Sequence, residues 1–122
     1  MVIDAREIGD VVIYDLKGRI CRTAGEERTL HEFVESDLGK GKRDFLLNFQ
    51  HVEFINSFGV GEILASYVSI NNMGGNLRLA RLPKKLLNPF FPIDPHFWPY
   101  EDEEAALKSF EKPKRRRRLF DI

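Results

Sequence analysis

The apolar positions at the start of the chain predict two strands followed by a helix. Residues 2–8 and 11–16 are short apolar-rich runs separated by Gly9-Asp10. A two-residue loop that contains glycine favours a β-hairpin, because glycine readily adopts the positive φ that such turns need. Thr23-Ala24-Gly25-Glu26 has the spacing of a capping box, so we predict that a helix begins there.

The middle of the chain predicts a buried strand and then a longer helix. Residues 44–49 include a continuous apolar run, which is typical of a strand buried on both faces. Beyond Ile55 the spacing changes, and apolar residues recur as on one face of a helix until Asn71-Asn72. These apolar positions are Val60, Ile63, Leu64, Tyr67 and Val68.

The last third of the chain predicts shorter elements. A brief strand is expected at residues 77–79, and Pro83 can begin a helix that must end before Pro89. Residues 89–100 hold four prolines and five aromatic residues, so any strand there lies at an edge, and the aromatic rings are expected to pack against the sheet. Asp102 can cap a final helix whose first turn is acidic.

The order of these elements predicts the fold class. Strands that alternate with helices after a hairpin favour an α/β fold. We expect a single-layer mixed β-sheet of four to five strands, covered by about four helices. One domain over residues 1–110 accounts for all of these elements, and residues 111–122 are expected to form a disordered tail.

Composition narrows the classes of protein. Hydrophobic residues make up 43% of the chain and charged residues 31%, as in soluble globular domains. No apolar run is long enough to cross a membrane and residues 1–10 lack a signal-peptide pattern, so we expect a cytoplasmic protein that does not bind membranes. Cys21 is the only cysteine, which excludes an intrachain disulfide and a cysteine-based zinc site.

Charge is divided unevenly along the chain. The net charge is zero, yet the last twelve residues contain six basic and two acidic side chains. The run Arg115–Arg118 could contact nucleic-acid phosphates, but terminal runs of like charge are usually solvated, so we do not expect nucleic-acid binding.

The stretch Ile55-Asn56-Ser57-Phe58-Gly59-Val60-Gly61 is the strongest candidate site. Its serine lies where the strand pattern gives way to the helix pattern. Ser57 can cap the helix, and the same helix end also favours a phosphate on this hydroxyl. Gly59 and Gly61 lower helix propensity, which suggests that either close approach of another group or tight packing is needed there. The cap and the modification site are compatible and both stay open.

Catalysis, cofactor binding and metal binding are not expected. A nucleophile elbow needs glycine where this chain has Ile55, and a P-loop needs Lys-Ser/Thr where it has Glu62-Ile63. The histidines show no triad order, and Asp94 and His96 have no partner pair at ligand spacing.

Several short motifs, in order and at matching intervals, resemble the anti-sigma factor antagonist (STAS domain) family. The likeness covers about residues 2–110. It rests on Gly18-Arg19-Ile20, Leu47-Asn48-Phe49, Val52 to Gly61, Gly74-Gly75 and Leu77-x-Leu79.

The resemblance implies a switchable binding protein without catalytic activity. It implies that Ser57 is phosphorylated by a partner that is both an anti-sigma factor and a serine kinase. Binding of the unmodified domain to this partner would release the sigma factor, and a PP2C-type phosphatase would reset the switch. The residues that would contact the partner are Asn56, Ser57, Phe58, Gly59, Val60 and Gly61.

Two residues depart from the family pattern. Asn56 replaces an aspartate, and Phe58 replaces a small residue. These departures leave two alternatives open: a kinase with different preferences, or a domain that is never phosphorylated and binds its partner constitutively. Such a domain would be a scaffold or accessory subunit of a signalling complex or of a lipid transporter. Whether the chain forms a homodimer also stays open.

Overall fold

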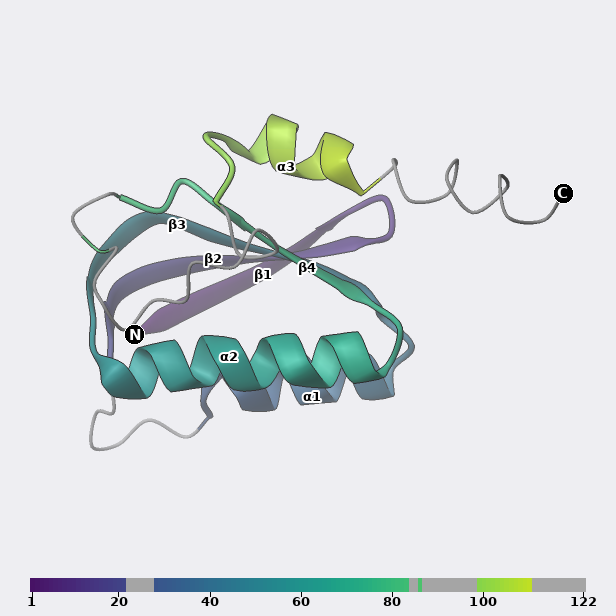
Figure 1. Cartoon of the computed structure of the whole chain (residues 1–122), viewed down its shortest axis with the longest axis horizontal. Helices are drawn as coiled ribbons and strands as arrows, with labels where there is room; N and C mark the ends of the chain where they lie inside the picture. Colours follow the sequence, from purple (N-terminus) through teal and green to yellow (C-terminus); the bar gives the residue numbers. More distant parts are fainter. Residues whose placement is uncertain (22–27, 84–85, 87–98, 111–122) are drawn as a thin grey trace, which may run out of the picture.

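The computed structural model describes residues 1–21, 28–83, 86 and 99–110 of the chain. Within them lie four strands and three helices (Figure 1). In chain order these are β1 (Val2–Ile8), β2 (Val11–Ile20), α1 (Leu30–Gly39), β3 (Asp44–Ile55), α2 (Ser57–Asn72), β4 (Asn76–Ala80) and α3 (Glu103–Ser109).

The strands form one mixed sheet in the order β1-β2-β3-β4. β1 runs antiparallel to β2, whereas β2, β3 and β4 run parallel to one another. Helices α1 and α2 lie side by side on one face of the sheet, and α3 lies on the other (Figure 1). The mixed α/β sheet predicted from the sequence is therefore confirmed.

The predicted hairpin joins β1 to β2. Ile8 and Val11 lie opposite each other, and Gly9 between them has a φ of +58°. Asp10 has no positive φ, so the loop has the glycine-first form of a tight hairpin turn. β2 extends beyond the predicted residues 11–16 to Ile20, which brings it to the start of α2.

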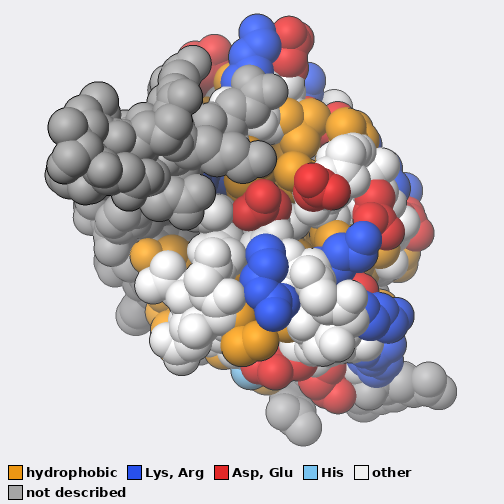
Figure 2. All heavy atoms as spheres, turned by 90° about the vertical axis from the view of Figure 1, so that its right-hand side faces the viewer, with side chains coloured by type: hydrophobic (Ala, Val, Ile, Leu, Met, Phe, Trp, Pro, Cys, Tyr) orange, Lys and Arg blue, Asp and Glu red, His pale blue; other side chains and the backbone are white. Residues whose placement is uncertain are grey.

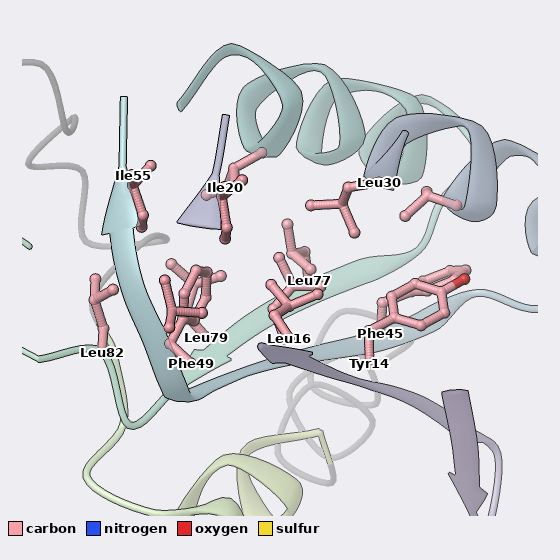
Figure 3. Close-up of a cluster of buried hydrophobic side chains, with 14 of the residues drawn as sticks. Tyr14, Leu16, Ile20, Leu30, Phe45, Phe49, Ile55, Leu77, Leu79 and Leu82 are labelled. Carbon is pink, nitrogen blue, oxygen red and sulfur yellow. The ribbon is translucent and has the colours of Figure 1, made fainter. Parts of the chain in front are cut away.

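The main hydrophobic core fills the space between the sheet and the two paired helices. Alternate residues of β2 and β3 point into it, as Figure 3 shows for Tyr14, Leu16, Phe45 and Phe49, all of which are fully buried. A smaller core lies on the other face of the sheet, where Ala106 of α3 packs against apolar residues of the strands. β3 is therefore buried on both faces along its first half, as its apolar run predicts.

The beginning of α1 differs from the prediction. The helix begins at Leu30, and Thr29 is its cap: the Thr29 hydroxyl accepts from the Glu32 N–H, and the Glu32 carboxylate accepts from the Thr29 N–H. The capping box assigned to Thr23-Ala24-Gly25-Glu26 is thus wrong as the start of this helix, because the same motif recurs six residues later beside the apolar stripe. Residues 22–27 lie outside the described part of the chain.

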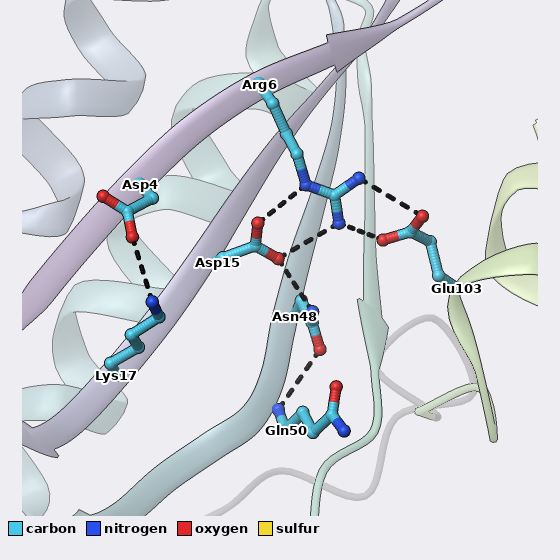
Figure 4. Close-up of polar contacts among 7 residues, drawn as sticks. All are labelled: Asp4, Arg6, Asp15, Lys17, Asn48, Gln50 and Glu103. Carbon is cyan, nitrogen blue, oxygen red and sulfur yellow. Dashed lines mark hydrogen bonds and ion pairs between the residues drawn. The ribbon is translucent and has the colours of Figure 1, made fainter.

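An ion-pair network fixes α3 to the open face of the sheet (Figure 4). Arg6 of β1 donates to both oxygens of Asp15 on β2, at 2.7 and 3.1 Å, and it also pairs with Glu103 of α3. Asn48 on β3 donates to the Asp15 carboxylate at 2.8 Å. Asp102 caps α3 by accepting from the Ala105 N–H at 2.8 Å, as predicted.

Other predictions fall largely outside the described residues. The helix expected from Pro83 and the aromatic segment before Tyr100 belong to this group, as does the tail 111–122. Of the segment 89–100, Tyr100 forms a single parallel bridge with Ala80 at the β4 edge of the sheet.

The end of the molecule away from the start of α2 carries charges of both signs. Figure 2 views this end, and basic and acidic side chains are interspersed among small apolar areas. Lys42 and Glu7, whose charged atoms lie 2.5 Å apart, form one of the ion pairs among the described residues. On the part of this face that the structure describes, basic and acidic side chains therefore lie close to one another.

Candidate functional site

The candidate site is the turn by which β3 enters α2. Ile55 ends β3 in the core, and Asn56 has the extended backbone of a helix cap, with φ −103° and ψ −173°. The Asn56 side-chain oxygen accepts from the Gly59 N–H at 3.0 Å. Ser57 is the first helical residue, so the prediction that Ser57 caps α2 is wrong. Asparagine is as good a cap as serine, and here it occupies the extended position just before the helix.

This correction leaves the Ser57 hydroxyl available. Ser57 is exposed, and the start of a sixteen-residue helix is the positive end of its dipole. No acidic residue lies in the first turn of α2. The site therefore offers an accessible hydroxyl where added negative charge is tolerated within the domain.

Gly59 is required for the close approach of α2 to β2. A Cβ atom on Gly59 would lie 2.4 Å from the backbone oxygen of Ile20 and 2.9 Å from Cγ2 of Ile55. The Asn56 N–H also donates to the Ile20 oxygen, at 3.3 Å. The end of β2 and the first turn of α2 are thus in close backbone contact, directly beside Ser57.

Gly61 has a different environment. A Cβ on Gly61 would meet no atom within 4 Å, and the residue is exposed. The expectation that both glycines permit close approach is met within the chain by Gly59 alone. Gly61 leaves an open surface one turn from Ser57.

The six predicted contact residues divide by exposure. Ser57 and Gly61 are exposed, and Asn56 and Phe58 are partly exposed. Gly59 and Val60 are buried and shape the turn from beneath.

Sequence reasoning missed a neighbouring feature. The Arg19 guanidinium lies over the Phe54 ring, 4.3 Å from its centroid, and the two residues lie opposite each other at the ends of β2 and β3. Phe54 is 36% exposed. A cationic group stacked on an exposed ring is a typical contact element. The sequence carried no signal for it, because the contact depends on the register of the two strands.

A Ser-His-Glu cluster lies between α1 and α2, but its geometry is not that of a nucleophilic triad. Nε2 of His31 lies 2.9 Å from both the Ser69 hydroxyl and the Glu35 carboxylate, and Ser69 itself donates to Glu35. In a triad the serine and the acid occupy opposite ring nitrogens, so that the imidazole can relay a proton. Here they share one nitrogen. The hydrogen bond from Ser69 and the neighbouring His31 lower the pKa of Glu35.

Within the described ranges, no three His, Cys, Asp or Glu side chains are grouped so that they could hold a metal ion. No helix in those ranges is long and apolar enough to cross a membrane.

Comparison with known families identifies the class of protein. The STAS domain model matches residues 2–98, so the chain belongs to the STAS domain family. Among curated proteins, none matches this sequence significantly.

Solved structures agree on the fold. The chain is similar to the Bacillus anti-sigma factor antagonist SpoIIAA in its unphosphorylated form, with a TM-score of 0.70 and 18% identity over 91% of this chain and 99% of that one. The NMR structure of TM1081, a Thermotoga maritima protein, gives a TM-score of 0.72 and 21% identity over 92% and 90% of the two chains. These TM-scores show a shared fold.

The same fold also occurs inside a much larger protein. The murine anion transporter Slc26a9 aligns with 85% of this chain over 18% of its own length, with a TM-score of 0.59 and 13% identity. Membership of the family therefore leaves the partner of this chain to be inferred from its own site.

Proposed function

We propose that this chain is an anti-sigma factor antagonist. In the cytoplasm it binds an anti-sigma factor that is also a serine kinase, and the bound sigma factor is released. Phosphorylation of Ser57 ends this binding, and a PP2C-type phosphatase restores it. The domain itself catalyses no reaction. The observation that carries the proposal is the exposed Ser57 hydroxyl on the first turn of α2, left available because Asn56 is the cap.

The geometry supports a switch based on charge. A phosphate adds about −1.5 to −2 charges at neutral pH, which opposes any tightly packed contact over this turn. Within the domain the helix dipole accommodates that charge, so phosphorylation would release the partner while α2 stays folded. Arg19 and Phe54 extend the proposed contact surface beyond the six residues of the turn.

Phosphosite mapping tests the proposal directly. The full chain is incubated with ATP and the anti-sigma kinase encoded near it, and the products are analysed by mass spectrometry. We expect a single phosphate on Ser57, and none on the Ser57→Ala variant. Ser69→Ala is the matched control, because the Ser69 hydroxyl is already bonded to Glu35 and should not be an acceptor. Phosphorylation at another residue would contradict the proposal.

A second candidate function is a scaffold or accessory-subunit role without phosphorylation. The amide of Asn56 in place of the family's acidic group favours it, as does the bulk of Phe58 beside the hydroxyl. This alternative predicts that partner binding is the same for Ser57→Asp and Ser57→Ala. The antagonist proposal predicts weaker binding for Ser57→Asp and unchanged binding for Ser57→Ala.

A further inference from the structure

The outer edge of β1 offers backbone groups for a further strand. β1 is an edge strand, and none of the described residues pairs with its outer side. The tight turn at Gly9-Asp10 makes Ile8 and Val11 a hydrogen-bonded pair, and bonded and non-bonded pairs then alternate along the hairpin. The backbone groups of Ile3, Ala5 and Glu7 therefore point away from β2, toward the free edge.

One face of this edge strand carries two apolar and two oppositely charged side chains. Val2 and Ile8, at its two ends, are 56% and 43% exposed. Between them lie Asp4 and Arg6, which project on the same side of the strand (Figure 4). Their side chains are 60% and 40% exposed, although Asp4 pairs with Lys17 at 3.3 Å and Arg6 with Asp15 and Glu103.

The four side chains of one copy of β1 are complementary to the same four side chains of a second copy in one antiparallel register. If two copies of β1 pair antiparallel about Ala5, Val2 lies opposite Ile8 and Asp4 opposite Arg6, and both pairs occur twice. The outward backbone groups of Ile3, Ala5 and Glu7 then face one another, as the hydrogen-bond pattern requires.

The neighbouring registers are unfavourable. A two-fold axis at Asp4 places two Asp4 carboxylates opposite each other, and an axis at Arg6 does the same to two guanidinium groups. Like charges directly opposite across a strand pair are destabilising. If the two-fold axis lies between two residues, backbone groups that point away from β2 in one copy face residues of the other copy whose backbone groups point toward β2. No ladder of hydrogen bonds can then form.

We propose that β1 is a self-association surface, where a second copy of this chain pairs antiparallel about Ala5 and joins two sheets into one. The interface is small and closed by two-fold symmetry, so the dimer is weak and depends on concentration. None of residues 56–61 belongs to β1, so this proposal is independent of the proposed switch at Ser57.

Amide exchange followed by NMR at increasing concentration of the full chain tests the surface and its register. As sedimentation shows dimer forming, the N–H groups of Ile3, Ala5 and Glu7 should become protected. Those of Asp4 and Arg6, already bonded to β2, should change little. A chain that stays monomeric up to millimolar concentration would overturn the proposal, and so would a dimer that leaves the three outward amides unprotected.

Two variants separate the interface from folding. The double variant Asp4→Arg/Lys17→Asp keeps the internal ion pair with reversed signs but places arginine opposite Arg6 of the second copy. We expect its dimer dissociation constant to rise about tenfold. Ala5→Pro removes the central outward donor and should abolish the dimer. If Ala5→Pro does not fold, the charge-reversed variant decides the question, and an unchanged dissociation constant refutes the register.

Discussion

At the residue scale, Gly59 determines how closely α2 approaches β2. Any side chain at this position would overlap the backbone oxygen of Ile20, which belongs to the sheet and has little freedom to move. Gly61, two residues further on, has open space around it. Glycine is therefore present at these two positions of one motif for different reasons. Packing inside the chain requires glycine at position 59. At position 61 no contact among the described residues requires it, which is consistent with contact by a partner.

This difference gives a paired stability prediction. Gly59→Ala should lower the free energy of unfolding by about 1–3 kcal/mol, the usual range for overpacking a tight contact. Gly61→Ala should leave it unchanged or raise it by up to about 1 kcal/mol, because alanine favours the helix. Urea unfolding of both variants measures the effect. Equal destabilisation by the two substitutions would contradict the packing argument.

Asn56 offers a second test at the same scale. Asn56→Ala removes the acceptor for the Gly59 N–H and should cost about 1 kcal/mol of stability, as loss of a helix cap usually does. Asn56→Asp keeps an acceptor and adds a charge that the helix dipole favours, so its stability should match or exceed that of the wild type. Thermal unfolding of the three proteins gives the comparison. A stable Asn56→Ala variant would show that the observed bond contributes little.

At the element scale, the short helix α3 is attached to the sheet by apolar packing and by ionic contacts. Its seven residues bury one small alanine and one serine, so the pairing of Arg6 with Glu103 and Asp15 contributes to its attachment. The hydrogen bond from Arg6, with a smaller contribution from Asn48, lowers the pKa of Asp15. Asp15 and Glu103 raise the pKa of Arg6 in return.

The lowered pKa of Asp15 predicts how stability depends on pH. A carboxyl group with a depressed folded-state pKa stabilises the fold above its ordinary value of about 3.9, and this contribution is lost as pH falls through the lower folded-state value. In Arg6→Gln the free energy of unfolding should fall less on acidification than it does in the wild type. Urea unfolding at neutral and strongly acidic pH measures how the free energy of unfolding changes with pH in the wild type and in Arg6→Gln. Lys108→Gln, which removes an exposed pair with Glu104, is the control and should leave the slope unchanged. An unchanged acid slope in Arg6→Gln would contradict the account.

The sequence predicts element types more reliably than element starts, and the two misplaced caps show why. Hydrophobic spacing identified α1, α2 and the hairpin, because burial on one face determines that spacing. Thr23 and Thr29 both begin a Thr-x-x-Glu motif, however, and Asn56 and Ser57 are both good caps. The choice within each pair depends on where the chain leaves the preceding strand, which is a property of the packed structure. The Arg19–Phe54 contact was missed for the same reason, since it follows from strand register.

At the scale of the whole molecule, the fold presents Ser57 on a fixed support. The ends of β2 and β3 hold the first turn of α2, while α1 lies beside α2 and stabilises it from the flank. Only the outward side of this turn is exposed, and this is where we propose that the partner binds. A phosphate on this exposed turn, as we propose, would change an interface without unfolding the domain.

The central claim is that phosphate on Ser57 controls partner binding. The most direct test is to measure the dissociation constant for the anti-sigma kinase with unmodified protein and with protein phosphorylated stoichiometrically on Ser57. Burying an unpaired charge at an interface costs enough to weaken binding by about thirtyfold or more, and this is the result we expect. Equal dissociation constants for the two forms would contradict the account.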